Sequence, residues 1–246
     1  MVTRKSAQEI DLMRHAGRIV AEVLALMEEE LKPGITTAQL NAIADDYIRK
    51  AGARPSFKGY QGYPASICVS IDDEVVHGIP SDERVISEGQ VVSVDVGAIW
   101  KGWHGDAART FFVGKPSAKV AGLIDTTRLS LMAGIAAAVP GAYIEDVSAA
   151  VEATAKGYGI VRQFVGHGIG RQMHEDPQVP NYKSGRGIRL EAGHCLAIEP
   201  MLTLGGPEVD VMADHWTVVT HDHSLAAHFE HSMAVTENGP VVLTTV

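Results

Sequence analysis

Four acidic side chains lie in or beside short apolar segments, where a charged group is costly unless something neutralises it. Asp95 ends the apolar run 91–94, and Glu199 ends the similar run 195–198. A second acid follows each of them, Asp106 before the run 110–113 and Glu230 before the run 233–235. We therefore expect two pairs of buried strands, each pair bearing two acids.

Clustered carboxylates cannot all ionise in a desolvated site without a shared proton, basic residues or metal ions. The segment Gly166-His167-Gly168 adds a glycine-flanked histidine, which we interpret as a nitrogen ligand. An oxygen-rich set with one imidazole and no thiolate suits Mn, Fe, Co or Zn. Two such ions, bridged by carboxylates at roughly 3.5–4 Å, would activate a water for attack on a carbonyl carbon.

The elements that must position these residues begin with two amphipathic helices. Ser6 and Glu9 form a capping box, and apolar residues then recur at helical spacing as far as Leu31. Thr37 is the expected cap of a second helix, which ends before Gly52.

Strands are expected where the acids lie. The apolar run 66–71 predicts a strand among glycine-rich loops, and Lys101-Gly102 predicts the turn that joins the strands of Asp95 and Asp106. Strand alternation would put His104 on the same face as Asp106.

A faint internal repeat organises the chain. Pro33-Gly34 recurs as Pro140-Gly141, and each copy precedes a helical pattern of apolar residues at matched positions. We expect one catalytic domain, residues 1–246, built from pseudo-symmetric halves of roughly 1–120 and 121–246. If the halves pack about a pseudo-twofold axis, the four acids converge where they join.

Composition indicates an ordinary globular protein. The formal net charge of -9 argues against DNA, RNA or an anionic membrane as the main partner. No signal peptide is recognisable, and no segment is expected to be long and apolar enough to span a bilayer. With Cys68 and Cys195 as the only cysteines, a disulfide framework is excluded and a reducing cytoplasm fits best.

A series of motifs, taken together, closely resembles type I methionine aminopeptidase over nearly the whole chain. They are Glu74-Val75-Val76-His77-Gly78-Ile79-Pro80, Asp95-Val96-Gly97, His104-Gly105-Asp106, Gly166-His167-Gly168-Ile169-Gly170, Met173-His174-Glu175-Asp176-Pro177, Ile198-Glu199-Pro200-Met201 and Phe229-Glu230-His231. The resemblance implies an α+β pita-bread fold of the creatinase/aminopeptidase type, in which helices cover a curved antiparallel sheet and the site lies between the halves. It also implies removal of the initiator methionine of new proteins when the next residue is small.

The same resemblance implies two divalent ions and a role for each ligand. Asp95 would bind one ion, Asp106 and Glu230 would bridge the two ions, and His167 and Glu199 would bind the other ion. Glu199 would also act as a proton shuttle during the reaction.

Two further histidines receive roles by the same resemblance. His174 would hydrogen-bond the scissile carbonyl oxygen, and His77 would position the substrate near the leaving group.

A methionine pocket is implied as well, and aromatic and sulfur groups suit a flexible thioether. Its residues would be Tyr60, Tyr63, Cys68, Met173 and Trp216, with Phe57 at the edge. Family members often carry Cys at the position of Phe57 and Phe at that of Met173, so the pocket of this chain departs from the pattern. Without the resemblance, the aromatic residues would read as core.

Several alternatives stay open at this level. An Xaa-Pro dipeptidase would share the ligands but normally has an additional N-terminal domain, and a type II enzyme would have a helical insertion where only the short segment 177–191 is present. An inactive relative that binds RNA or protein would have lost ligands. The histidines of the C-terminal region, His215, His221, His223, His228 and His231, are expected to be surface residues rather than a second metal site.

The activity that the resemblance implies also predicts the partners and the location of the protein. The substrate would be the N-terminal methionine of nascent chains, which would bring the protein to the ribosome in the cytoplasm. We expect a monomer.

Overall fold

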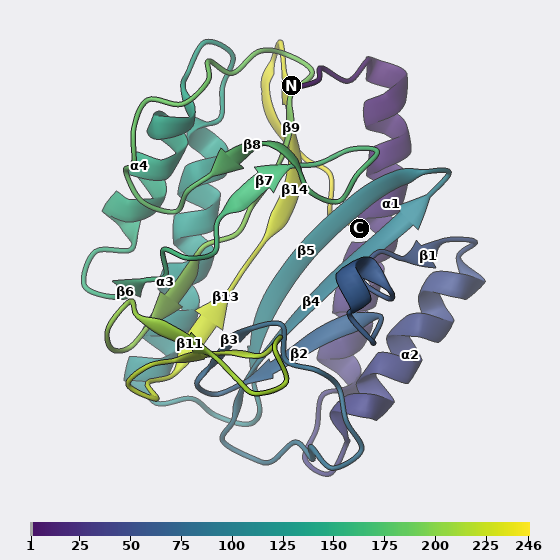
Figure 1. Cartoon of the computed structure of the whole chain (residues 1–246), viewed down its shortest axis with the longest axis vertical. Coiled ribbons are helices and arrows are strands. Elements are labelled where there is room, and N and C mark those ends of the chain that lie inside the picture. Colours follow the sequence, from purple (N-terminus) through teal and green to yellow (C-terminus); the bar gives the residue numbers. More distant parts are fainter. Residues whose placement is uncertain (1) are drawn as a thin grey trace.

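The protein is described by a computed structural model that covers residues 2–246. Its first part places two helices, α1 (Ala7–Glu30) and α2 (Thr37–Lys50), against an antiparallel sheet (Figure 1). Long strands β4 (Val91–Trp100) and β5 (Trp103–Phe112) form a hairpin, and β2 (Ile67–Ile71) and β1 (Arg54–Pro55) pair with β4. Apolar side chains of α1 and α2 pack on those of β4 and β5 in one core. This packing removes apolar surface from water and fixes the hairpin.

Side chains cap the N-termini of both helices. Ser6 and Glu9 make the predicted capping box of α1. The prediction for α2 was wrong by one residue: Thr36, not Thr37, accepts from the backbone N–H of Gln39, whose side chain accepts from the N–H of Thr36. The Thr37 hydroxyl instead donates to the carbonyl of Ser81 at 3.1 Å, so each threonine has its own partner.

The β4–β5 hairpin confirms the predicted turn. Lys101 (φ 49°) and Gly102 (φ 79°) both have left-handed backbone, which suits a two-residue connection between twisted strands. In this hairpin Asp95 lies opposite Ala108 and Asp106 lies opposite Gly97. The prediction that Asp95 ends its strand was wrong, because β4 continues to Trp100. The predicted strand at 66–71 is confirmed as β2.

The second part of the chain repeats the arrangement of two helices on a sheet. Helices α3 (Ala118–Ala137) and α4 (Ile144–Thr154) pack on strands in the order β15 (Gly239–Val242), β14 (His231–Thr236), β9 (Cys195–Ile198), β7 (Gly166–Gly168) and β8 (Glu175–Val179). As predicted from the repeat, α4 follows Pro140-Gly141 much as α2 follows Pro33-Gly34. The boundary between halves near residue 120 stays a prediction.

Shorter elements complete the molecule. They are η1 (Tyr60–Gly62), β3 (Glu74–Val76), β6 (Gly159–Ile160), β10 (Met201–Thr203), β11 (Val209–Val211), β12 (Val218–Thr220) and β13 (Ala226–His228). They form two small sheets, β13-β10-β6 and β11-β12-β3, beside the larger ones.

Helix α3 corrects the expectation that no segment could span a bilayer. By length and composition alone, Ala118–Ala137 is long and apolar enough. In the structure Val120, Leu123, Leu131 and Ile135 of this helix are buried, and the helix packs on α4, β10 and β13. A core helix of a globular protein passes the same test, so the finding is weak evidence for a membrane.

The two parts of the chain join along β5. Ala108 and Glu230 exchange backbone hydrogen bonds of 3.3 and 2.9 Å, and the Ser232 hydroxyl both donates to the carbonyl of Asp106 at 2.8 Å and accepts from its N–H at 2.9 Å. The Thr110 hydroxyl donates to the carbonyl of His228 at 2.7 Å. This seam brings Asp106 and Glu230 together from distant parts of the sequence.

Candidate active site

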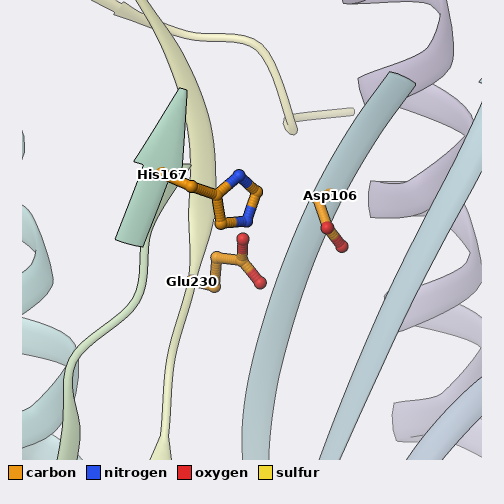
Figure 2. Close-up of side chains that lie close together, drawn as sticks. All are labelled: Asp106, His167 and Glu230. Atoms are coloured by element: carbon orange, nitrogen blue, oxygen red, sulfur yellow. The ribbon is translucent and has the colours of Figure 1, made fainter. Parts of the chain in front are cut away.

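The predicted acids and His167 meet at this seam, and strands or strand ends hold them. Asp95 and Asp106 are within β4 and β5, His167 is the middle residue of β7, Glu199 directly follows β9, and Glu230 lies between β13 and β14. Asp106, His167 and Glu230 each offer one ligand atom, and these atoms lie within 4.8 Å of one another (Figure 2). His167 Nε2 lies 3.5 Å from Glu199 Oε1. Asp95 and Glu199 face the same cavity as the other three.

Glycines on both sides of His167 allow its strand to lie close to its neighbours. A Cβ on Gly166 would be 2.4 Å from the carbonyl oxygen of Ala197, and one on Gly168 would be 2.1 Å from that of Asp176. Any other residue would push β7 away from β9 and β8. The predicted role of the glycines, to give His167 uncrowded backbone, is thus explained by strand packing.

Burial raises the pKa of every carboxyl group in this cluster. The pKa of Asp95 rises to about 7. For Asp106 and Glu230, burial is the largest cause, and the charges of the neighbouring acids raise the pKa further. The pKa of Glu199 is raised mainly by burial and further by the charge of Asp95. In contrast, burial lowers the pKa of His167 to about 3, so its ring is neutral and can act as a ligand.

The buried acids fit a divalent metal. Among the described residues, Asp95 Oδ1, Asp106 Oδ1 and Glu230 Oε1 are buried without a hydrogen-bond partner. Such atoms cost free energy unless something else binds them, and a cation would supply both the partner and the missing positive charge. Carboxylate oxygens with one neutral imidazole suit first-row divalent metals.

Two further histidines lie beside the acids, as predicted. The Nδ1 atom of His174 is 2.8 Å from the Tyr60 hydroxyl, and its ring centroid is 4.3 Å from that of His167. His77 has left-handed backbone (φ 61°), and its ring lies edge-on to the rings of Phe164 and Trp216. Burial lowers the pKa of both histidines, to about 4 for His77. Both rings are therefore neutral, and each can donate one hydrogen bond and accept another.

A cavity of about 200 Å³ contains all the predicted residues. Its lining includes the acids, the three histidines and the predicted pocket residues Phe57, Tyr60, Tyr63, Cys68, Met173 and Trp216. Phe57, Tyr63, Cys68 and Met173 are buried in one apolar cluster with Ala65. The sequence analysis missed Gln61, Phe164 and Val165, which also line the cavity. Their place in the chain, beside Tyr60 and directly before Gly166-His167, was the available signal.

His228 corrects the expectation of surface histidines. Its side chain is 2% exposed, and its Nε2 lies 4.0 Å from Glu199 Oε2. Burial lowers its pKa to about 3. His221 and His223 are exposed, as expected, and bind Asp210 and Asp73 through Nδ1 at 2.7 Å.

Comparison with known proteins agrees with this geometry. The model of metallopeptidase family M24 matches residues 11–237. The methionine aminopeptidase of Clostridium acetobutylicum is 52% identical, with 99% of each chain covered. Methionine aminopeptidase 1 of Mycobacterium tuberculosis is 51% identical over 99% of this chain and 95% of its own.

Solved structures give the same result. The crystal structure of methionine aminopeptidase from Thermotoga maritima superposes with a TM-score of 0.98 at 43% identity, with both chains fully covered. Prolidase from Pyrococcus furiosus shares the fold alone, with a TM-score of 0.80 at 23% identity over 99% of this chain and 65% of its own. The expected pita-bread fold is confirmed, and the family implies that a divalent metal is used. The chain belongs to the methionine aminopeptidases of metallopeptidase family M24.

Proposed function

We propose that this protein is a type I enzyme that removes the initiator methionine from nascent polypeptides when the next residue is small. One observation carries the proposal: a buried group of acids with unpaired oxygens opens into a cavity lined by aromatic and sulfur side chains. The acids suit hydrolysis with metal ions, and the lining suits a thioether. This substrate would be met in the cytoplasm, near the ribosome.

The metal site of the proposal has two divalent ions, Co, Mn, Fe or Zn. Asp95 would bind one ion, Asp106 and Glu230 would bridge, and His167 and Glu199 would bind the other. Bound ions would supply Lewis acidity, which can bring the pKa of a water down to about 7. Support comes from the convergence of these residues and from the neutral state of the His167 ring.

Side chains of the protein would transfer protons and stabilise the negative charge that forms on the scissile carbonyl oxygen. Glu199, whose pKa is raised by burial, is suited to hold a proton and to pass it toward the leaving nitrogen. His174 would donate a hydrogen bond to the scissile carbonyl oxygen as negative charge forms on it. His77, which also lines the cavity, would position the peptide near the leaving group.

Selectivity for methionine is proposed to come from the apolar end of the cavity. Tyr63 and Trp216 meet edge to face with ring centroids 5.0 Å apart, and Phe57, Cys68 and Met173 pack in the same cluster. Burial keeps the Cys68 thiol neutral by raising its pKa, so it presents an uncharged sulfur to the substrate.

The test is metal-dependent cleavage of short peptides. Metal-stripped protein would receive Mn, Co, Fe or Zn separately, and Met-Ala-Ser would be compared with Leu-Ala-Ser and Ala-Pro-Ala. We expect release of methionine alone, dependent on metal and lost in Asp95→Ala. Cleavage of Ala-Pro-Ala instead would keep the metal site and refute the methionine pocket. No cleavage with any metal would favour an inactive binding relative.

A further inference from the structure

A lysine at the start of the chain is almost fully buried near the candidate active site. The Lys5 side chain is 4% exposed, and its Nζ donates to Glu175 Oε2 at 2.7 Å. The same ammonium group donates to Thr3 Oγ1 at 2.8 Å and reaches the Thr3 carbonyl at 3.4 Å. Its three protons therefore have three acceptors, which defines a single geometry for the pair.

Glu175, the partner of Lys5, closes the loop that carries His174. Its Oε1 accepts from the backbone N–H of Gln172 at 3.1 Å, and its Oε2 accepts from the hydroxyl of Thr3 at 3.3 Å. Between Gln172 and Glu175 lie only Met173 and His174, both of which line the cavity. Burial alone would raise the pKa of Glu175, but the hydrogen bonds from Lys5, Gln172 and Thr3 and the charge of Lys5 together outweigh it, and the pKa is lowered. The carboxylate is thus charged and firmly bound.

The other end of this loop is fixed by β5. The backbone N–H of His104 donates to the carbonyl of Gly170 at 2.9 Å, and the guanidinium group of Arg171 lies over the Trp103 ring at 4.2 Å. At Gly170 an added Cβ would come within 2.6 Å of Lys5 Cε, so the loop lies directly against the lysine stem. The backbone N–H of Lys5 in turn donates to the carbonyl of Gly193 at 2.7 Å.

We infer that Lys5 and Glu175 are positioning residues for His174, which gives the buried Lys5 side chain a part in the function of the active site. The inference rests on the proposed function, since it concerns how His174 meets the scissile carbonyl. A catalytic hydrogen bond depends on sub-ångström placement of its donor. Without the pair, the loop keeps its hydrogen bond to β5 and the pairing of Glu175 with Gly168, but it loses the side-chain contacts that hold it against Lys5, and the placement of His174 becomes less exact.

The experiment is a double-mutant cycle on Met-Ala-Ser cleavage by the metal-loaded enzyme. The variants are Lys5→Met, His174→Ala and the double variant, with Arg4→Met as the matched control. Arg4 is in the same segment but forms an exposed ion pair with Glu191, with side chains 59% and 52% exposed. The folded fraction and the metal affinity of each variant would be measured in parallel.

Lys5→Met is expected to lower kcat/KM on the order of 10- to 100-fold, while Arg4→Met stays close to the wild type. In the His174→Ala background, Lys5→Met should cause little further loss, because the group it positions is gone. A merely structural role would lower kcat/KM by the same factor in both backgrounds, and that result would overturn the inference.

A second variant guards against misfolding of Lys5→Met. Glu175→Gln keeps an acceptor for Gln172 and Lys5 but removes the charge, and a smaller loss of kcat/KM in the same direction is expected. Wild-type kcat/KM in Glu175→Gln would also refute the inference. If the wild type itself fails to release methionine with any metal, the proposed function fails instead, so the two failures are distinguishable.

Discussion

At the scale of single residues, Tyr60 has two tasks that the sequence does not separate. It lines the cavity, as expected for a pocket residue, and its hydroxyl is 2.8 Å from His174 Nδ1. When the hydroxyl donates to Nδ1 of the neutral ring, the remaining ring proton lies on Nε2. That tautomer presents a donor to a carbonyl oxygen, which is the role proposed for His174.

Replacing Tyr60 tests this tautomer. Tyr60→Phe keeps the apolar ring but removes the hydrogen bond, and we expect kcat for Met-Ala-Ser to fall by about 2- to 10-fold, the range of one hydrogen bond. Steady-state kinetics would measure it. Tyr47→Phe is the control, because that hydroxyl binds Glu22 at 3.1 Å between α1 and α2. Equal kcat in the two variants would show that the Tyr60 hydroxyl does not act on His174.

At the scale of elements, the contact between α1 and β5 sets the position of Asp106. A Cβ on Gly17 of α1 would lie 2.4 Å from the carbonyl oxygen of Leu243, and a Cβ on Gly105 would lie 2.5 Å from the backbone nitrogen of Gly17. Helix backbone therefore packs directly on the strand, one residue before Asp106. Gly17 occupies an apolar position in the predicted helix stripe, where Ala would ordinarily be the better helix former.

The variant Gly17→Ala should therefore destabilise the protein despite its better helix propensity. The added methyl meets backbone rather than a flexible side chain, so we expect the free energy of unfolding to fall by about 1–3 kcal/mol, as in overpacked cores. Urea unfolding of the metal-loaded protein would measure the change. Arg18→Ala, at an exposed position of the same helix, should change it by less than about 1 kcal/mol. A more stable Gly17→Ala would mean that α1 can move away from the backbone of Leu243 and Thr244.

At the scale of the whole molecule, the acids at the seam couple stability to metal and to pH. In metal-free protein, burial raises the folded-state pKa of Asp95 to about 7 and that of Asp106, Glu199 and Glu230 well above the usual values. The folded state then binds more protons than the unfolded chain. The stability of the seam is therefore present at low pH and is lost as pH rises through the folded-state pKa values.

The buried histidines act with the opposite sign but in a different pH range. Burial lowers the pKa of His77, His167 and His228, so their contribution to stability is lost as pH falls below about 6.5, the unfolded value. Above about pH 7 these groups are neutral in both states. Between about pH 7 and pH 8 the buried carboxyl groups set how the free energy of unfolding changes with pH. Toward pH 8.5 the thiols of Cys68 and Cys195, whose pKa values are raised by burial, add a decrease of the same sign.

We therefore expect the unfolding free energy of metal-free protein to fall from about pH 7 to about pH 8.5. Urea titrations at several pH values would measure it. Saturating Mn or Co should remove the decline, since a bound cation favours the ionised acids and stabilises the folded state. Asp106→Asn, with one acid fewer, should show a shallower decline without metal. A flat profile in metal-free wild type would contradict the clustering of these acids.

Much of the candidate site could be predicted from the sequence because its signals are local. The Ser6 capping box and the Lys101-Gly102 turn each depend on residues that are close in the sequence. The glycines around His167 mark the site in the sequence, although the strands that they pack on are distant along the chain. One of the errors was local too. Choosing Thr37 over Thr36 moved a cap by one residue, since neighbouring threonines have the same capping chemistry and only the contact with Ser81 separates them.

By itself, then, the sequence determined which residue types this protein brings to its chemistry and which segments become helices and strands. Only the tertiary structure decided their pairing: Asp106 with Glu230 at the seam, Tyr60 with His174, Lys5 with Glu175 across 170 residues, and the burial of His228. Local patterns reflect short-range forces along the chain. Contacts between distant residues depend on how whole helices and sheets pack to remove apolar surface from water, and no short segment encodes that packing alone.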